Sequence, residues 1–253
     1  MGSFFFGYIM GIFNTAQSYM TTVVYPDMSD TVEYLMTSFV PLGAGVGAYL
    51  AGHLSQKTGR RKAMLITDFI SIVGVAIQLL PNVYLLLTGR LICGFCVGLN
   101  STLVPQYINE VAPIKVKGIA GTMVQVFLNI GILGSYLIAN GLPDNFQPGD
   151  TPVFFWKVMF GFPFVTCGIR VLFLLVAFNQ DTPKYCVMNG NEDEASTMLK
   201  RIYPKEYALE HLIQLRRSKE LEASHETSSD NNETSKKAFS KRFRAGVLLS
   251  VFQ

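Results

Sequence analysis

The sequence predicts an all-α membrane protein, and its composition, its apolar runs and the placement of its charges each point to that class. Hydrophobic residues make up 49% of the 253 residues and charged residues only 15%, which is well below the quarter that is usual in soluble domains. Six apolar runs are long enough to cross the ~30 Å hydrocarbon core of a bilayer as helices. They cover Gly2–Tyr25, Thr37–Ser55, Ala63–Leu80, Leu91–Val111, Gly118–Gly141 and Trp156–Asn179.

Basic residues concentrate in alternate links between these runs, and this alternation indicates the topology. The links after the second and fourth runs hold Lys57, Arg60, Arg61, Lys62, Lys115 and Lys117. The links after the first and fifth runs carry no Lys or Arg and hold Asp27, Asp30, Glu33, Asp144 and Asp150. Because short cytosolic loops are rich in Lys and Arg, we expect the N-terminus and the links after the even-numbered runs in the cytosol.

The last part of the chain is expected to be soluble, because more than half of the charged residues of the whole chain lie from Asp181 onward. A first helix is expected from Asn191, with one apolar stripe of Ala195, Met198, Leu199 and Ile202. A second helix is expected over Pro204–Leu221, followed by a linker over 222–244 that is polar, acidic and aperiodic over Glu222–Ser235 and basic thereafter. The predicted domains are therefore a helix bundle over 1–180, cytosolic helices and linker over 181–244, and the start of a seventh span over 245–253.

Polar residues inside the apolar runs are the candidate functional residues, because such groups are costly in a bilayer. Gln125 and Asn129 are four residues apart and share one helix face, which should line a cavity or a helix contact. Asp68 has two interpretations, a functional carboxylate or a partner of the basic link that holds Lys62. The sequence suggests no partner for Arg170.

The sequence gives no sign of catalytic chemistry. Cys93 and Cys96 have the spacing of a redox or zinc pair, but they lie within an apolar run without a His or an acid nearby, so we interpret them as packing residues. Neither a nucleophile–base pair nor a metal cluster nor a phosphate loop is evident. We therefore expect no catalytic residue, no metal and no cofactor, and the nearly balanced charge does not suggest a nucleic-acid partner.

The most specific motif lies in and after the fourth run. It opens with Gly89-Arg90, continues as Pro105-Gln-Tyr-Ile-Asn-Glu110-Val-Ala-Pro113, and ends in the basic link that leads to Gly118. This pattern resembles the sugar-porter branch of the major facilitator superfamily. There the fourth helix opens with Gly-Arg and closes in a Pro-x-Tyr-x-x-Glu-x-x-Pro pattern.

Three further segments carry the same resemblance. The link Gly52-His-Leu-Ser-Gln-Lys57-Thr-Gly59-Arg60-Arg61 resembles the superfamily signature Gly-x-Leu-x-Asp-Arg-x-Gly-Arg-Arg, with Gln and Lys in place of the acid and the first arginine. The first run opens with Phe6-Gly7-Tyr8, as the first helix of sugar porters does. The sixth run is followed by Asp181-Thr-Pro183-Lys184, which is similar to the family's closing Pro-Glu-Ser-Pro-Arg motif.

The resemblance implies the N-terminal half of a sugar porter. The expected fold is a six-helix bundle built from two inverted three-helix repeats, which moves a hexose-like sugar by rocking against a second bundle. Such a protein is not an enzyme. Its expected partners are a small-molecule sugar, the lipid bilayer and a C-terminal six-helix bundle, and its expected location is the plasma membrane with the linker in the cytosol.

The resemblance also implies roles for individual residues. Gln125, with Phe6 and Asn129, would contact the sugar; the alternative for the two amides is plain contact between helices. A charge network that holds the outward-open state would consist of Arg60, Arg61, Glu110, Lys117 and Asp181. We therefore expect Glu110 within salt-bridge reach of one or more of Arg60, Arg61 and Lys117.

One departure from the family pattern bears on energy coupling. Proton-coupled sugar porters carry an aspartate directly after Gly-Tyr, paired with the arginine that opens the fourth helix. The matching positions here are Ile9 and Arg90, and isoleucine cannot bind a proton. This departure favours facilitated diffusion, and it leaves a proton-coupled sugar or polyol (inositol) symporter and a non-transporting sugar sensor as alternatives.

Overall fold

The computed structural model describes residues 1–26, 29–113, 116–142, 154–176, 181–203, 208–209 and 212–221. Several sequence features lie outside these residues, namely Asp27, Lys115, Asp144, Asp150, the linker over 222–244 and the apolar run from Ala245. The chain divides into two units, Met1–Tyr185 and Cys186–Gln253, which are described separately.

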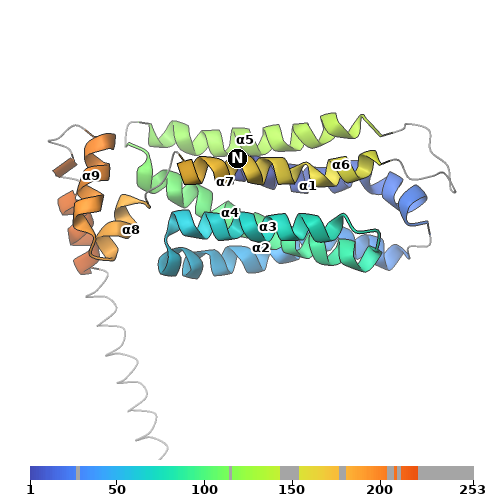
Figure 1. Ribbon diagram of the computed structural model, residues 1–253, viewed down its shortest axis with the longest axis horizontal. Helices are drawn as coiled ribbons and strands as arrows, with labels where there is room; N and C mark the ends of the chain where they lie inside the picture. Colours follow the sequence, from blue (N-terminus) through green and yellow to red (C-terminus); the bar gives the residue numbers. More distant parts are fainter. Residues whose placement is uncertain are drawn as a thin grey trace, which may run out of the picture. The chain divides into compact units, whose positions relative to one another are not determined.

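The first unit consists of long helices that lie alongside one another (Figure 1). They are α1 (Gly2–Tyr19), the π-helix η1 (Met20–Val24), α2 (Asp30–Thr58), α3 (Arg60–Gln78), α4 (Val83–Val111), α5 (Lys117–Ala139), α6 (Phe155–Gly161) and α7 (Pro163–Val176). In the described part of the chain, four helical stretches are long and apolar enough to cross a membrane: α2, α4, α5 and the stretch Phe155–Val176. The other two predicted spans are helical as well, as α1 with η1 and as α3.

Helices α2 and α4 begin about two turns before the apolar runs that predicted them, because polar residues favour these earlier starts. Helix α2 begins at Asp30 and carries Asp30 and Glu33 in its first turn, where negative charge is favourable toward the helix dipole. Helix α4 begins at Val83 because Asn82 caps it, its side-chain oxygen accepting a hydrogen bond from the Tyr84 backbone N–H at 2.9 Å.

Helices α1 and α5 approach each other so closely that glycines stand at their points of nearest contact. A Cβ atom on Gly7 would overlap the carbonyl oxygen of Leu128 on α5, and one on Gly131 would overlap the carbonyl oxygen of Phe4 on α1. Glycine at such positions lets two backbones come into direct contact, as in other membrane helix pairs.

Helices α4 and α2 repeat this contact residue for residue. A Cβ atom on Gly94 would overlap the Val40 carbonyl oxygen, and one on Gly43 would lie 2.5 Å from the Leu91 carbonyl oxygen. The first helix of each three-helix set thus packs against the second helix of the other set. This reciprocity is what two inverted repeats require, and the predicted six-helix bundle fold is confirmed.

Apolar side chains fill the bundle interior in three clusters that follow one another along α2 and α4. The first includes Met36 and Leu86, the second Val40 and Cys93, and the third Ala51 and Leu99. The second cluster also contains Cys96 and Cys167, and all three of its cysteines are buried free thiols. Their surroundings agree with the interpretation of the cysteines as packing residues.

The second unit contains the predicted first cytosolic helix. Helix α9 (Glu192–Ile202) follows Asn191, and its Ala195 packs with Cys186 and Val187 near the end of α8 (Pro183–Met188). Residues 208–209 and 212–221 of the predicted second helix are helical. Lys219 Nζ donates a hydrogen bond to the Val187 carbonyl oxygen at 2.9 Å, which ties this helix to α8.

The close contact of α2 with α4 predicts unequal effects of alanine at two neighbouring glycines. A Cβ atom on Gly47 would overlap the Phe95 carbonyl oxygen, whereas one on Gly45 would meet nothing within 4 Å. We expect Gly47→Ala to lower the free energy of unfolding by ~1–3 kcal/mol through overpacking. Gly45→Ala should be neutral or stabilising by up to ~1 kcal/mol through helix propensity. Denaturant titration followed by circular dichroism measures both, and equal effects of the two substitutions would contradict the packing described.

Candidate functional site

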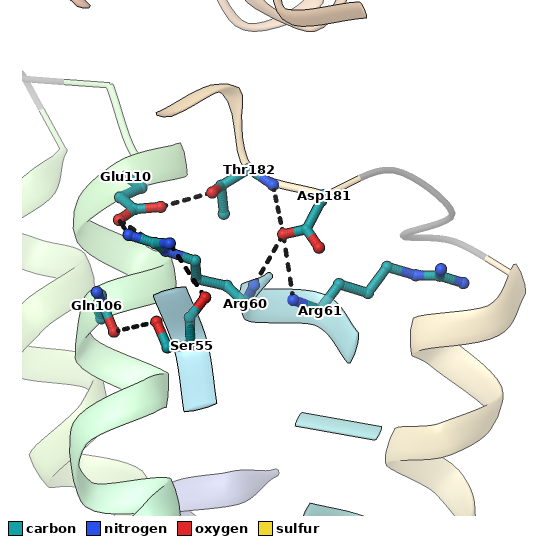
Figure 2. Close-up of polar contacts among 7 residues, drawn as sticks. All are labelled: Ser55, Arg60, Arg61, Gln106, Glu110, Asp181 and Thr182. Atoms are coloured by element: carbon teal, nitrogen blue, oxygen red, sulfur yellow. Dashed lines mark hydrogen bonds and ion pairs between the residues drawn. The ribbon is translucent and has the colours of Figure 1, made fainter. Parts of the chain in front are cut away.

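The start of α3 is the centre of a polar network formed by Ser55, Arg60, Arg61, Gln106, Glu110, Asp181 and Thr182 (Figure 2). Gly59 joins α2 to α3 and has φ +86°, a backbone conformation that favours glycine. A Cβ atom at Gly59 would also overlap the Asp181 carboxylate. Glycine at this position therefore allows both the tight turn and the approach of Asp181.

Asp181 caps α3 from a distant part of the chain. Its Oδ1 accepts hydrogen bonds from the backbone N–H groups of Arg60 at 3.0 Å and Arg61 at 3.3 Å, and from that of Thr182 at 2.9 Å. The first backbone N–H groups of a helix have no partner within the helix and carry its positive dipole end. A carboxylate accepts hydrogen bonds from these N–H groups and its negative charge is favourable at the positive end of the dipole. Asp181 therefore attaches the segment after α7 to the start of α3.

The Arg60 side chain joins α3 to the end of α4. Its Nε and Nη2 donate to Glu110 Oε1 at 3.0 and 2.8 Å, and its Nη1 donates to the Ser55 carbonyl oxygen at 3.2 Å. The other Glu110 oxygen, Oε2, accepts a hydrogen bond from Thr182 Oγ1 at 2.5 Å. Only 7% of the Arg60 side chain and 11% of the Glu110 side chain are exposed, so water competes little for these bonds.

Two further bonds extend the network to α2 and α7. Ser55 Oγ donates to Gln106 Oε1 at 3.0 Å, which joins α2 to α4. Arg61 Nε donates to the Leu174 carbonyl oxygen at 3.0 Å, at the end of α7, where a cation is favourable toward the helix dipole. The network therefore ties α2, α3, α4 and the end of α7 together at one end of the bundle.

The structure brings four of the five predicted network residues together. The expected contact of Glu110 is confirmed, with Arg60 as its partner, while Lys117 is exposed at the start of α5 and takes no part in the network that Figure 2 shows. Sequence reasoning missed Ser55, Gln106 and Thr182. Gln106 lies one helical turn before Glu110 on the same face, which is a signal that the sequence did contain.

A second polar cluster lies inside the bundle and consists of Asp68, Asn100 and Arg170. Arg170 Nε donates to Asp68 Oδ2 at 2.8 Å, its Nη2 donates to Asp68 Oδ1, and its Nη1 donates to Asn100 Oδ1 at 2.7 Å. The suggestion that Asp68 pairs with the basic link near Lys62 is therefore wrong. Asp68 is completely buried, and its partner comes from α7, far along the chain.

Ile9 and Arg90 are both buried, and the partners of Arg90 are a backbone oxygen and an aromatic ring. Ile9 is buried in the second apolar cluster. Arg90 is buried as well, with its Nε donating to the Met36 carbonyl oxygen at 2.8 Å and its guanidinium 4.2 Å above the Phe13 ring. The arginine is thus held by a backbone oxygen and an aromatic face, in place of a carboxylate.

The residues expected to contact a sugar differ in exposure. Phe6 is half-buried against the second apolar cluster, whereas Gln125 and Asn129 are exposed on α5. In the most apolar stretch of α5 only 11% of the residues are buried, compared with 61% of the residues in the matching stretch of α4. The two amides therefore lie on a helix that the rest of this bundle leaves largely uncovered.

A protein-family model described as "Sugar (and other) transporter" matches residues 1–253. Among curated proteins, plastidic glucose transporter 4 of Arabidopsis thaliana is 30% identical over 258 residues, covering 100% of this chain and 44% of that protein. Probable inositol transporter 2 of Arabidopsis thaliana is 32% identical over 261 residues, covering 100% of this chain and 43% of that protein. The chain thus spans somewhat less than half the length of these curated relatives.

The fold is similar to that of the xylose transporter XylE from E. coli in a partially occluded, inward-open conformation. That comparison gives a TM-score of 0.75 at 21% identity, covering 86% of this chain and 56% of the other chain. At this level of identity the likeness concerns the fold alone.

The polar network predicts a measurable opening when its charge pair is weakened. Ser55→Cys places a thiol at a fully buried position and keeps the Ser55 carbonyl oxygen that accepts from Arg60 and a weak donor toward Gln106, so its reaction with a soluble thiol reagent reports opening of the network relative to this parent. Glu110→Gln should raise that reaction rate about tenfold, because a charge-assisted bond is roughly 1.4 kcal/mol stronger than a neutral one.

The matched control is Glu33→Gln. Glu33 accepts a hydrogen bond from Gln17 Nε2 at 2.5 Å in the first turn of α2, far along that helix from Ser55, and its replacement should leave the rate unchanged. Equal rates in Glu110→Gln and its parent would contradict the assigned contact.

Proposed function

Because this chain belongs to the sugar transporter family, we propose that it forms the N-terminal half of a carrier that moves a hexose-like sugar across a membrane by alternating access. The family is shown by the model that matches the whole chain, and the protein is an integral, multi-pass membrane protein. A central site between two bundles requires a second bundle. The lengths of the relatives, of which this chain covers 44% and 43%, support a partner bundle of similar size.

The observation that carries the proposal is the exposed amide pair on α5. An amide that faces lipid leaves its hydrogen-bonding groups unpaired at considerable cost, yet Gln125 and Asn129 are both exposed on an otherwise apolar helix. A polar ligand or a second bundle on that face removes the cost. An amide offers both donors and an acceptor, which suits the hydroxyl groups of a sugar.

The polar network around Arg60 supports a role as the gate at the cytosolic end of the bundle. The basic links that contain Arg60, Arg61 and Lys117 favour the cytosolic side, so we place this end of the bundle and the linker in the cytosol. We propose the plasma membrane as the location of the carrier, an assignment that the basic links do not bear on. Network bonds that form in one state and break in the other bias the balance between them by their difference in free energy. The contacts of Arg60 with Glu110 and of Asp181 with the start of α3 are the bonds we assign to the outward-open state.

Facilitated diffusion is the mode of transport that the first helix supports. The position expected of a proton-binding carboxylate is Ile9, which has no ionisable group, and Arg90 is already held by the Met36 carbonyl oxygen and the Phe13 ring. A pair of this composition cannot exchange a proton near neutral pH. Flux through the complete protein then depends on the sugar gradient alone.

Truncation of Gln125 in the complete protein tests the assignment of the site. Gln125→Ala should weaken equilibrium binding of labelled hexose by ~1–3 kcal/mol, because hydroxyl groups of the bound sugar lose their partner while buried. Expression and unfolding temperature should stay near those of the parent, since an exposed side chain gives up little packing.

Two variants control this measurement. Gln56→Ala removes the same amide from an exposed position on α2 and should leave the affinity unchanged. Asn129→Ala tests the neighbouring amide on the same face. If only Asn129→Ala weakens binding, Asn129 and not Gln125 binds the sugar. If neither Gln125→Ala nor Asn129→Ala changes the affinity, this face of α5 only contacts other helices.

A further inference from the structure

One face of α3 carries polar residues that bind α6 and α7 along the length of the bundle. These residues are Arg61, Asp68 and Gln78. Their partners are, in order, the Leu174 carbonyl oxygen, the Arg170 guanidinium and the Phe160 carbonyl oxygen. The contact of α3 with α6 and α7 joins the third helices of the two repeats. The Asp68 and Gln78 bonds are buried in the bundle interior, whereas the Arg61 bond belongs to the polar network at one end of the bundle.

The middle bond of this series is an ion pair with matched geometry. Both oxygens of Asp68 accept from Arg170, and the remaining Nη1 of Arg170 donates to Asn100 Oδ1. Exposure is 0% for Asp68, 7% for Arg170 and 2% for Asn100. The Asn100 Nδ2 is buried without a hydrogen-bond partner, so among the described residues the Asn100 side chain bonds only to Arg170.

Burial makes this pair sensitive to any displacement of the two helices. Taking two charges out of water is costly, and only close, hydrogen-bonded pairing repays the cost. A shift of α3 against α7 by one helical turn, about 5.4 Å, would leave a carboxylate and a guanidinium buried and unpaired. The pair therefore permits one register of the two helices and penalises the others.

The end of α7 lies beside the first turn of α3, where the Arg61 side chain donates to the Leu174 carbonyl oxygen. Asp181 caps the Arg60 and Arg61 backbone N–H groups at the same turn, so the register of α3 against α7 bears on where Asp181 meets α3. Asp68 and Arg170 belong neither to the polar network of Figure 2 nor to the proposed sugar site. They lie between α3 and α7 in the bundle interior, away from the residues of that network.

We propose that Asp68 and Arg170 form an obligate charge pair that fixes the register of α3 against α7 and so positions Asp181 on the first turn of α3. Both are positioning residues, because they act on the network through the helices that carry them. The proposal does not depend on the identity of the transported substrate.

The first test is the unfolding temperature of the full-length protein, read with a fluorogenic thiol reagent. Cys93, Cys96 and Cys167 are free thiols buried in the bundle, so we expect them to react when the bundle opens. Cys186→Ser removes the free thiol of the second unit from every variant. Asp68→Asn leaves the Arg170 charge unpaired and should lower this temperature by about 10 °C. Asp68→Asn with Arg170→Gln leaves no unpaired charge and should recover at least half of the loss.

The control is Asp30→Asn, which removes a carboxylate from an exposed position at the start of α2 and should shift the temperature by no more than about 2 °C. If Asp68→Asn does not fold, folding of the double variant is itself the expected result. Arg170→Gln alone is measured as well. A double variant whose loss of unfolding temperature equals the sum of the losses in Asp68→Asn and Arg170→Gln overturns the proposal, because the two residues are then not coupled.

The second test separates positioning from stability. The cysteine reporter at Ser55 should react several-fold faster in Asp68→Asn than in its parent, at a temperature where both are folded, and the double variant should restore the slow rate. An unchanged reporter rate in a destabilised Asp68→Asn overturns the proposal, since the pair would then stabilise the bundle without setting the network. Neither measurement involves sugar, so a failure here is distinct from a failure of the proposed function.

Discussion

The buried guanidinium of Arg60 is the constraint on which the rest of this end of the bundle depends. A charge with 7% exposure must be paired and fully hydrogen-bonded, and its partners come from α2 and α4. The backbone of the same residue is capped by Asp181, which follows α7. Side chain and backbone of one residue thus hold together segments that are far apart in the chain.

The two polar clusters differ in how deeply they are buried and therefore in the free-energy cost of breaking them. The network at the start of α3 lies at one end of the bundle, where Asp181 is partly exposed, and in the proposed carrier its bonds break and form again as the state changes. The Asp68–Arg170 pair is deeply buried and joined by two hydrogen bonds, so breaking it leaves unpaired charges in an apolar interior. We regard the first as the moving contact and the second as a contact that keeps the moving body intact.

Much of this arrangement could be predicted from the sequence, for physical reasons that also explain what could not. The spans follow from the length and apolarity of the runs, and the contact of Glu110 with Arg60 follows from motifs that resemble a known family. The partner of Asp68 could not be predicted, because a charge within an apolar run indicates that a partner exists without indicating which helix supplies it. The early starts of α2 and α4 were missed because capping residues such as Asn82 lie outside the apolar runs.

The central claim is that this bundle carries sugar only together with a second bundle, and without a proton. Uptake of labelled hexose into liposomes, measured with and without an inward proton gradient, tests it most directly. The complete protein should give saturable uptake that stops at the external concentration in both conditions, and the 253-residue chain alone should give none. Accumulation above the external concentration that requires the proton gradient, or saturable uptake by the chain alone, would contradict the account.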